Sequence, residues 1–218
     1  VRNVMIMGGS RIAVRASQHA PEYMNIKIIE NDINRCNRLT ELVDDRIMII
    51  NGDGRDIDLL LEEGIKSTDA FVALTDNSET NILACLAAKR MGVIKTVAEV
   101  ENIDYISMAE SLDIGTVINK KMIAASHIHQ IMLDADVSNV KCLTFANADV
   151  AEFKVKEGSR ITQKAIKDMG LPKGITIGGM IRNGEGILVT GNTIIQPGDH
   201  VVVFCLEKMI KKAEKFFN

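Results

Sequence analysis

The 218-residue sequence has no long apolar segment, and this limits the kinds of protein it can be. Its purely apolar runs, such as Ile82–Ala88 and Val201–Leu206, are far shorter than the roughly 20 residues that a bilayer-spanning helix needs. The first residues also lack the extended apolar core of a secretory signal. We therefore expect a chain that does not insert directly into a membrane.

The sequence also lacks a large excess of either charge and any closely spaced cysteine pair. The net charge is −3 and the pI about 5.9, so the composition does not indicate a nucleic-acid-binding surface. His127 and His129 are two residues apart in a predicted helix, point to different faces and make a poor metal pair. We expect no metal site. Free, buried thiols in a reducing compartment are expected at the four cysteines, Cys36, Cys85, Cys142 and Cys205.

Up to about residue 119, short apolar strands alternate with helical segments. This alternation is typical of βαβ units, which form a parallel sheet covered by helices. The predicted strands are 4–7, 26–30, 46–51, 70–74, 95–99 and 116–118. The predicted helices between them include 33–43, 56–63 and 82–91. The sequence therefore predicts an α/β fold with a Rossmann-like, doubly wound parallel sheet.

The first predicted strand runs into a glycine turn and then a helix. Apolar residues 4–7 precede the turn Gly8–Ser10, and the helix opens at Arg11. This order matches the dinucleotide fingerprint, in which a tight glycine turn directs a helix N-terminus toward a pyrophosphate. Of the three fingerprint glycines only Gly8 is present, because Ser10 and Ala13 occupy the other two positions. Ala13 is tolerated, whereas the Cβ of Ser10 lies where the backbone should approach a phosphate.

Three later positions fit the same type of site. Glu30 ends the second predicted strand, where an acidic side chain would hold ribose hydroxyls and repel a 2′-phosphate, although a simple surface acid is an equal alternative. Asp53 follows the third strand at the sheet edge where ligands bind, and a plain turn explains it as well. The polar run from Thr75 to Asn81 is richer than one helix cap requires, so we expect part of it to line the site.

These residues resemble, in order, the TrkA family, the cytosolic regulatory subunits of bacterial Trk potassium uptake systems. The most specific likenesses are Leu74-Thr75, Glu79-Thr80-Asn81 opening a helix with Ala84-Cys85, and Asp104-Tyr105. Gly8, Arg11, Glu30 and Gly52-Asp53 also fit the family pattern. The resemblance covers essentially the whole chain, as a TrkA-N (RCK or KTN) domain followed by a TrkA-C (RCK_C) domain. Such subunits often carry this pair of domains twice, and a start at Val1 with an altered glycine turn resembles the second, C-terminal half.

The resemblance implies a regulatory subunit without catalytic residues. It implies a subunit that gates a membrane potassium-translocating partner (TrkH-like) in response to NAD(H) or ATP/ADP. It further implies a homo-oligomer, a dimer or larger, in the cytoplasm and peripheral to the inner face of the cell membrane. Arg11 and the glycine turn would contact phosphate, Glu30 would hold ribose, Asp53 would flank adenine and Thr75 would close the pocket. The implied cofactor-binding residues are Gly8, Gly9, Ser10, Arg11, Ala13, Glu30, Asp53 and Thr75.

Departures from the family pattern leave a second interpretation open. Glu99 and Glu101 stand where many relatives have arginines after the fifth strand, which replaces attraction of phosphate by repulsion. Ser78 replaces an acid of the family's SDETN-like run. Together with Ser10, these changes argue against nucleotide occupancy, and they keep open a structural or dimerising half with an empty crevice.

An NAD-dependent dehydrogenase is a third interpretation, and the sequence disfavours it. Hydride transfer needs an arrangement such as a His/Asp pair or a Tyr-x-x-x-Lys on one helical face. The only such motif, Tyr23 with Lys27, has its lysine in a predicted strand. No histidine falls near the predicted carboxyl ends of the strands.

The segment Lys120–Ala135 is predicted to form an amphipathic helix with Ile128, Ile131, Met132 and Ala135 on one stripe. That stripe packs on its own domain or, by the resemblance, belongs to a crossover helix exchanged between two subunits. We expect the domain boundary at residues 134–136. The TrkA-N domain then spans 1–135, with its crossover helix at about 120–135, and the TrkA-C domain spans 136–218.

Beyond this boundary the pattern changes to that of a small α+β domain with hairpins. The predicted strands are 150–155, 175–182, 187–190 and 200–206, with turns at 183–186 and 196–199. A short helix is predicted at 162–169, closed by Gly170, and another at the C-terminal end. The resemblance implies a ligand-sensing or dimerising module.

Overall fold

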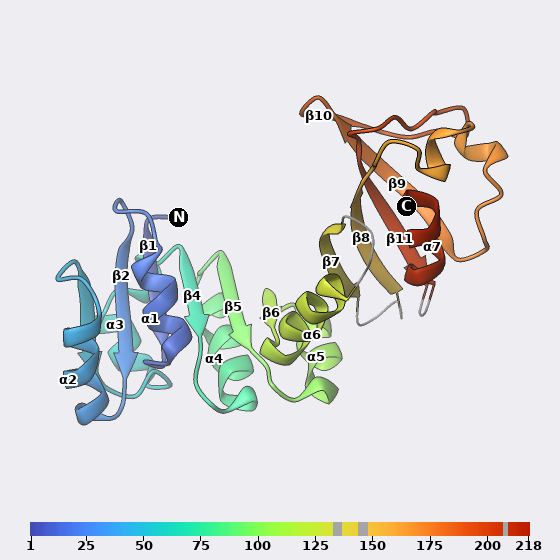
Figure 1. Ribbon diagram of the computed structural model, residues 1–218. Helices are drawn as coiled ribbons and strands as arrows, with labels where there is room; N and C mark the ends of the chain where they lie inside the picture. Colours follow the sequence, from blue (N-terminus) through green and yellow to red (C-terminus); the bar gives the residue numbers. More distant parts are fainter. Residues whose placement is uncertain (133–136, 144–147, 207–208) are drawn as a thin grey trace. The chain divides into compact units, whose positions relative to one another are not determined.

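A computed structural model describes residues 1–132, 137–143, 148–206 and 209–218. The chain divides into two compact units, Val1–Lys120 and Lys121–Asn218, each with its own sheet (Figure 1). The domain boundary expected at residues 134–136 lies outside the described residues. Among the residues described, none of the helices combines the length and apolar character needed to cross a bilayer.

The first unit is built on a six-stranded parallel sheet in the order β3-β2-β1-β4-β5-β6. The chain starts at the centre, extends the sheet to one edge, and then returns to build the other half. This is the doubly wound order, so the predicted Rossmann-like fold is confirmed. The strands are β1 (Asn3–Met7), β2 (Asn25–Glu30), β3 (Ile47–Asn51), β4 (Ala70–Ala73), β5 (Lys95–Glu99) and β6 (Thr116–Ile118).

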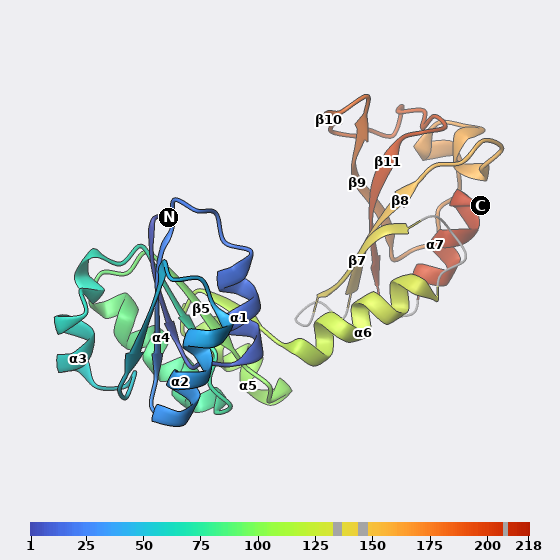
Figure 2. The ribbon, with the colours of Figure 1, turned by 60° about the vertical axis from the view of Figure 1, so that its left-hand side comes forward.

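Helices cover both faces of this sheet, α1 and α2 on one and α3 and α4 on the other (Figure 2). They are α1 (Arg11–Gln18), α2 (Ile33–Leu42), α3 (Ile57–Glu62), α4 (Ser78–Arg90) and α5 (Ile103–Ser111), with a 3₁₀ turn, η1 (Ile65–Ser67). Short polar side chains begin several of them, since Asp32, Asp56 and Asn102 accept N–H bonds from the first turns of α2, α3 and α5. The prediction that α4 begins at residue 82 is wrong, because Asn77 caps it and Ser78 is its first residue.

The apolar strands are buried because helices shield both sides of the sheet. In β1 the side chains of Met5, Ile6 and Met7 are at most 3% exposed. Ile6 packs in one cluster with Ala13 of α1 and Leu39 of α2. This packing fixes α1 and α2 against the carboxyl ends of β1 and β2, where the glycine turn lies.

The second unit contains a five-stranded antiparallel sheet in the order β10-β9-β11-β8-β7. Its strands are β7 (Val137–Leu143), β8 (Ala148–Lys154), β9 (Ile175–Arg182), β10 (Glu185–Ile187) and β11 (His200–Leu206). The helix α7 (Ile210–Phe217) contributes Phe217, whose ring stacks on that of Phe153 with centroids 4.4 Å apart. The predicted small α+β domain is therefore confirmed.

Two details of the second unit were predicted wrongly. The helix expected at 162–169 is replaced by two 3₁₀ turns, η2 (Arg160–Thr162) and η3 (Ile166–Asp168). The backbone N–H of Ile166 donates to Thr193 and that of Lys167 to Gly191, so these donors are not available for a continuous helix. The return strand expected at 187–190 is instead β10, which begins two residues earlier and ends at Ile187.

The helix α6 (Lys120–Ile131) begins at the last residue of the first unit. Ile128, Ile131 and Met132 of its predicted apolar stripe are exposed, and Ala135 lies outside the described residues. An exchange of this helix between subunits remains a prediction.

The cysteines agree with expectation where their side chains are described. Cys36, Cys85 and Cys205 are free and buried. Burial raises the pKa of the Cys85 thiol to about 12 and that of Cys205 to about 11. The side chain of Cys142 lies outside the described residues.

Candidate functional site

A cavity of about 1270 Å³ lies at the carboxyl ends of the central strands of the first unit. Its walls come from the glycine turn, the end of β2, the turn after β3 and the loop after β4. Ligands of open α/β sheets bind at this edge, where the strand order reverses. Seven of the eight predicted cofactor-binding residues line the cavity: Gly8, Gly9, Ser10, Arg11, Glu30, Asp53 and Thr75. Ala13, on the buried face of α1, is fully buried and packs against the sheet.

The glycine turn requires its two glycines for different reasons. Gly8 has a φ of +100°, and a Cβ there would lie 2.9 Å from the carbonyl oxygen of Leu74. A Cβ at Gly9 would collide with the side chain of Leu39 in α2. The turn is therefore pressed between the end of β4 and α2. Gly8 cannot be replaced by a larger residue without strain, and a larger residue at Gly9 would displace the Leu39 side chain.

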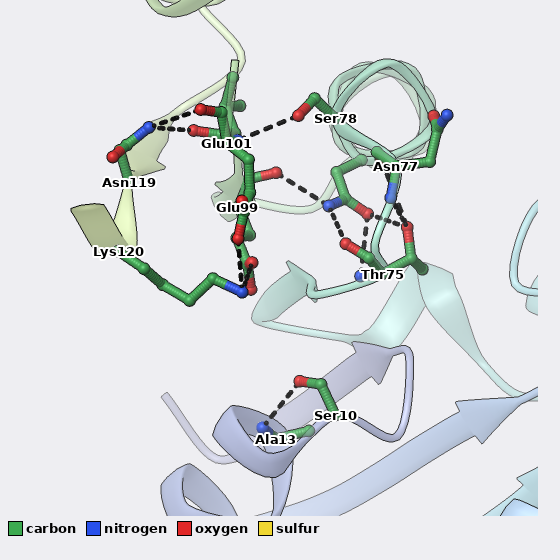
Figure 3. Close-up of polar contacts among 11 residues, drawn as sticks. Ser10, Ala13, Thr75, Asn77, Ser78, Glu99, Glu101, Asn119 and Lys120 are labelled. Atoms are coloured by element: carbon green, nitrogen blue, oxygen red, sulfur yellow. Dashed lines mark hydrogen bonds and ion pairs between the residues drawn. The ribbon is translucent and has the colours of Figure 1, made fainter. Parts of the chain in front are cut away.

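Ser10 is the N-cap of α1, and its hydroxyl accepts the N–H of Ala13 at 3.3 Å (Figure 3). Its side chain thus satisfies one of the donors at the helix N-terminus. The N–H groups of Arg11 and Ile12 have no acceptor within the described part of the chain. The turn consequently keeps two backbone donors for an anion, together with the positive end of the helix dipole.

Glu30 is 4% exposed, and both of its carboxylate oxygens bind backbone of the same chain. One oxygen accepts the N–H of Gly9 at 2.8 Å, and the other accepts the N–H of Asp32 at 3.0 Å. The carboxylate thus links the glycine turn to the first turn of α2. It lines the cavity as predicted, but as a buried connection between two chain segments rather than as a surface acid.

Asp53 lies at the predicted cavity edge and is paired with a neighbour. Arg55 donates to it from two guanidinium nitrogens, the shortest contact being 2.6 Å between Nη2 and Oδ2. The hydrogen bonds from the Arg55 side chain and backbone lower the pKa of the Asp53 carboxyl. The side chain of Asp53 is 44% exposed, so the pair is accessible at the rim of the cavity.

Thr75 is held by Asn81, a fully buried residue in the first turns of α4. The Thr75 hydroxyl donates to Asn81 Oδ1 at 2.6 Å and the Thr75 N–H donates to the same oxygen at 3.1 Å. The Asn81 amide donates in turn to the carbonyls of Thr75 and Glu99, at 2.9 and 2.8 Å. Asn81 thus connects the ends of β4 and β5 and fixes the loop that carries Thr75.

The two glutamates after β5 share one lysine. Lys120 Nζ lies 2.6 Å from Glu99 Oε1 and 2.7 Å from Glu101 Oε1, and Lys120 itself lines the cavity (Figure 3). The hydrogen bond to Glu101, which has the largest effect, and the hydrogen bond to Glu99 raise the pKa of Lys120. Ser78, the other departure, accepts the N–H of Glu101 at 3.0 Å. The expected repulsion of phosphate by two bare carboxylates is therefore reduced, because an ammonium group lies between them and faces the cavity.

Sequence reasoning missed Asn81 and Lys120 as individual site residues. Asn81 was included only within a polar run and a family likeness, and Lys120 only as the start of a predicted helix. Both act across more than 17 residues of sequence, and no local pattern marks such a contact. Within the described residues, no three His, Cys, Asp or Glu side chains are grouped so as to hold a metal ion.

Comparison with known proteins identifies both parts of the chain. Residues 4–120 match the family model of the TrkA-N domain, and residues 150–218 match that of the TrkA-C domain. The Trk system potassium uptake protein TrkA of Halomonas elongata is 31% identical over 221 residues, and that of Haemophilus influenzae 32% over 222 residues. Both alignments cover 100% of this chain and 48% of the relative. The chain therefore spans about half the length of these curated relatives, and the predicted resemblance is confirmed.

Solved structures share the fold at low sequence identity. The RCK domain of GsuK has a TM-score of 0.58 and 15% identity, with 100% of this chain and 48% of that chain covered. The GsuK channel bound to NAD has a TM-score of 0.57 and 15% identity, with coverage of 100% and 39%. The TrkA-N domain of the inner membrane protein ybaL from Escherichia coli has a TM-score of 0.53 and 11% identity, with coverage of 60% and 96%.

Proposed function

The chain belongs to the TrkA-N domain family and also carries a TrkA-C domain, and on this basis we propose that it is a regulatory part of a potassium uptake system. It binds an adenine nucleotide, NAD(H) or ATP/ADP, in the cavity of the first unit. Binding changes the activity of a membrane potassium-translocating partner of the TrkH type. The chain acts in the cytoplasm, at the inner face of the membrane, as a homo-oligomer.

One observation carries this proposal: the N-terminus of α1 borders the cavity, and Arg11 and two backbone N–H groups with no acceptor among the described residues are available there for an anion. A helix N-terminus of this kind attracts phosphate through its dipole and its unsatisfied donors. Arg11 adds a planar, permanently charged guanidinium that bonds phosphate oxygens in pairs.

The remaining roles follow from position. Glu30 keeps lone pairs beyond its two backbone bonds and accepts a ribose hydroxyl. Asp53 and Arg55 border the adenine at the rim, and Thr75 closes the cavity above the glycine turn. Because a ligand shifts a conformational equilibrium only through its different affinities for the two states, the nucleotide must bind one arrangement of the assembly more tightly.

Titration of the chain with NADH, ATP and ADP by calorimetry tests the binding step. At least one should bind, and Arg11→Gln should weaken it by about tenfold or more, since a charge-assisted bond to phosphate is lost. Arg90→Gln is the matched control, because Arg90 lies at the far end of α4 and outside the cavity. If none of the three nucleotides binds, the binding step is refuted.

Potassium uptake tests the regulatory step. Cells that lack the corresponding native protein should regain nucleotide-dependent potassium uptake with the full-length protein, and much less with its Arg11→Gln variant. Equal uptake by both would refute control through this cavity.

A structural or dimerising half with an empty crevice is the second candidate function. It is favoured by the hydrogen bonds of Ser10 and Glu30 within the chain, which already occupy some of the backbone N–H donors around the glycine turn. The same titration decides between the two. Turnover of NADH with a small alcohol or keto acid would instead indicate a dehydrogenase, which this proposal excludes.

The domain division remains part of the proposal. We assign residues 1–135 to the nucleotide-responsive domain and 136–218 to the TrkA-C domain. Limited proteolysis should cut first near this junction.

A further inference from the structure

The cavity extends beyond the glycine turn into the groove between α1 and α2, and four arginines line that groove. Arg11 and Arg15 lie one turn apart on α1, and Arg35 and Arg38 lie one turn apart on α2. The two helices cover the same face of the sheet (Figure 2), and the Gln18 side chain donates to the carbonyl of Leu42, which joins their C-terminal ends. The four arginines thus line one groove from both of its helices.

None of these four side chains has an ion pair or hydrogen bond with the described residues. Several other cations of the first unit are paired, as Lys27 is with Glu63, Arg46 with Asp44 and Lys89 with Asp113. Like charges one helical turn apart repel each other. The chain as a whole carries a net charge of −3, so composition does not explain a group of unpaired arginines. An anion in the groove would relieve this repulsion.

Two of the acids that line the cavity, Glu30 and Asp53, are already bonded to other groups of the chain. Glu30 is buried and bonded to the backbone of Gly9 and Asp32. Asp53 is paired with Arg55. The carboxylate expected to repel a ribose phosphate is therefore bonded to two backbone donors, while the arginines beside it line the cavity.

The location identifies the part of a nucleotide that would reach the arginines. In doubly wound folds the adenosine ribose lies at the end of the second strand, and a nearby arginine accommodates a phosphate on its 2′-hydroxyl. Glu30 ends β2, and Arg35 and Arg38 lie in the first two turns of the helix that follows. A phosphate ester on the ribose would point into the groove, whereas the pyrophosphate would lie at the N-terminus of α1.

We propose that Arg15, Arg35 and Arg38 form a second anion subsite, which binds a phosphate esterified to the adenosine ribose of the bound nucleotide. This inference rests on the proposed function and deepens it, because it makes a ribose-phosphorylated adenine nucleotide, of the NADP(H) type, the preferred ligand over NAD(H). It reverses the expectation from the sequence that Glu30 excludes a 2′-phosphate. Arginine suits this task because its planar fork bonds two phosphate oxygens at once.

Calorimetry with ligands that differ by one phosphate tests the subsite. Adenosine 5′-monophosphate is compared with adenosine 2′,5′-bisphosphate and 3′,5′-bisphosphate, and NAD⁺ is compared with NADP⁺. The added phosphate should tighten binding about tenfold or more, as expected of a charge-assisted bond. The 2′ and 3′ isomers reveal which ribose hydroxyl carries the recognised phosphate.

The double variant Arg35→Gln/Arg38→Gln tests the residues. The ratio of the NAD⁺ and NADP⁺ dissociation constants should fall from about ten or more in the wild type to near one. Arg90→Gln is the control and should keep the wild-type ratio. Circular dichroism and the melting temperature show whether each variant is folded. The single variant Arg15→Gln, which changes the α1 side of the groove, should also reduce this ratio.

The outcomes separate this inference from the proposed function. If the monophosphate and NAD⁺ bind but the additional phosphate changes affinity less than twofold, the subsite is refuted and the proposed function stands. A double variant that keeps the wild-type ratio likewise refutes it. If no nucleotide binds at all, both proposals fail.

Discussion

At the scale of single residues, Ser10 has two opposing effects. Its hydroxyl caps α1, and its Cβ occupies space beside the backbone donors that a phosphate would approach. The Ser10 side chain therefore determines both the stability of the turn and the access of a phosphate to its backbone donors.

Two substitutions at Ser10 separate these effects. Ser10→Ala removes the cap and should lower the free energy of unfolding by about 1 kcal/mol. Ser10→Gly should cost only a few tenths of a kcal/mol, since glycine is a fair N-cap, and should tighten nucleotide binding because the backbone becomes accessible. Urea unfolding and calorimetric titration measure the two quantities. Weaker binding by the glycine variant than by wild type would contradict this account.

Asp199 makes the second unit sensitive to acid. It is 2% exposed, and burial by itself would raise its pKa. The bonds from Arg182, at 2.7 and 2.8 Å, and from the Gln196 N–H nevertheless lower it. A carboxyl whose folded pKa lies below its unfolded value of about 3.9 contributes stability above that pH and loses it as the pH falls further.

We therefore expect the second unit to lose stability as the pH drops below about 4. Asp199→Asn should destabilise it by about 3 kcal/mol at pH 7, because Arg182 is left without its partner. The difference between variant and wild type should shrink at pH 3. Urea unfolding at both pH values measures this, and a difference independent of pH would argue against the ion pair as its source.

At the scale of elements, Asn81 connects three parts of the first unit. Its amide joins the start of α4 to the backbone at the ends of β4 and β5, and it is fully buried. Replacing it leaves the N–H and C=O of Thr75 and the C=O of Glu99 without their partner.

Asn81→Ala should therefore destabilise the first unit by about 3 kcal/mol, because several buried polar groups lose their partner. Asn77→Ala on the same helix end is the matched comparison. It removes only the N-cap bond to Thr80 and should cost about 1 kcal/mol. Chemical denaturation measures both, and equal costs would show that the buried bonds contribute no more than a cap.

The sequence predicts the helices and strands of the first unit well where local sequence patterns determine the secondary structure. Continuous apolar runs identify β1, β3 and β4, because both faces of the sheet are covered. The expected start of α4 was too late, since Ser78, Thr80 and Asn81 are residues typical of turns and caps. The helix begins at Ser78 because Asn77 caps it, and the bond from Asn81 to the distant Glu99 carbonyl also fixes its first turns. The region 162–169 was misassigned for a similar reason, because Thr193 and Gly191 accept its N–H groups.

The same distinction holds for the candidate site. Position along the strands correctly identified Gly8, Glu30 and Asp53 as cavity-lining residues, because parallel strands end at a common edge. The partners of these residues were not predictable. The bond from Gly9 to Glu30 spans 21 residues, and Lys120 reaches Glu99 from the start of another helix. Such contacts depend on how whole segments pack.

At the scale of the whole molecule, the two units have separate apolar cores. Ile6, Ala13 and Leu39 belong to the first, and Phe153 and Phe217 belong to the second. Unfolding of one unit therefore need not remove the packing of the other.

Phe153→Ala should lower the stability of the second unit by about 4 kcal/mol, since a fully buried aromatic ring is lost. The first unit should keep its own transition in differential scanning calorimetry, together with any affinity for nucleotide. A chain ending at Met132 should bind nucleotide in the same way. Simultaneous loss of both transitions in Phe153→Ala would demonstrate a single cooperative unit instead.

The position of Lys120 joins cavity and helix in one residue. Its ammonium lies between two carboxylates, its side chain forms part of the cavity wall, and its backbone opens α6. A ligand phosphate and the two glutamates would compete for that single positive charge. A bound phosphate would then weaken the ion pairs of Lys120 with Glu99 and Glu101, which fix the first turn of α6. Because coupling between two sites is reciprocal, a restraint on α6 would change the ligand affinity by the same factor.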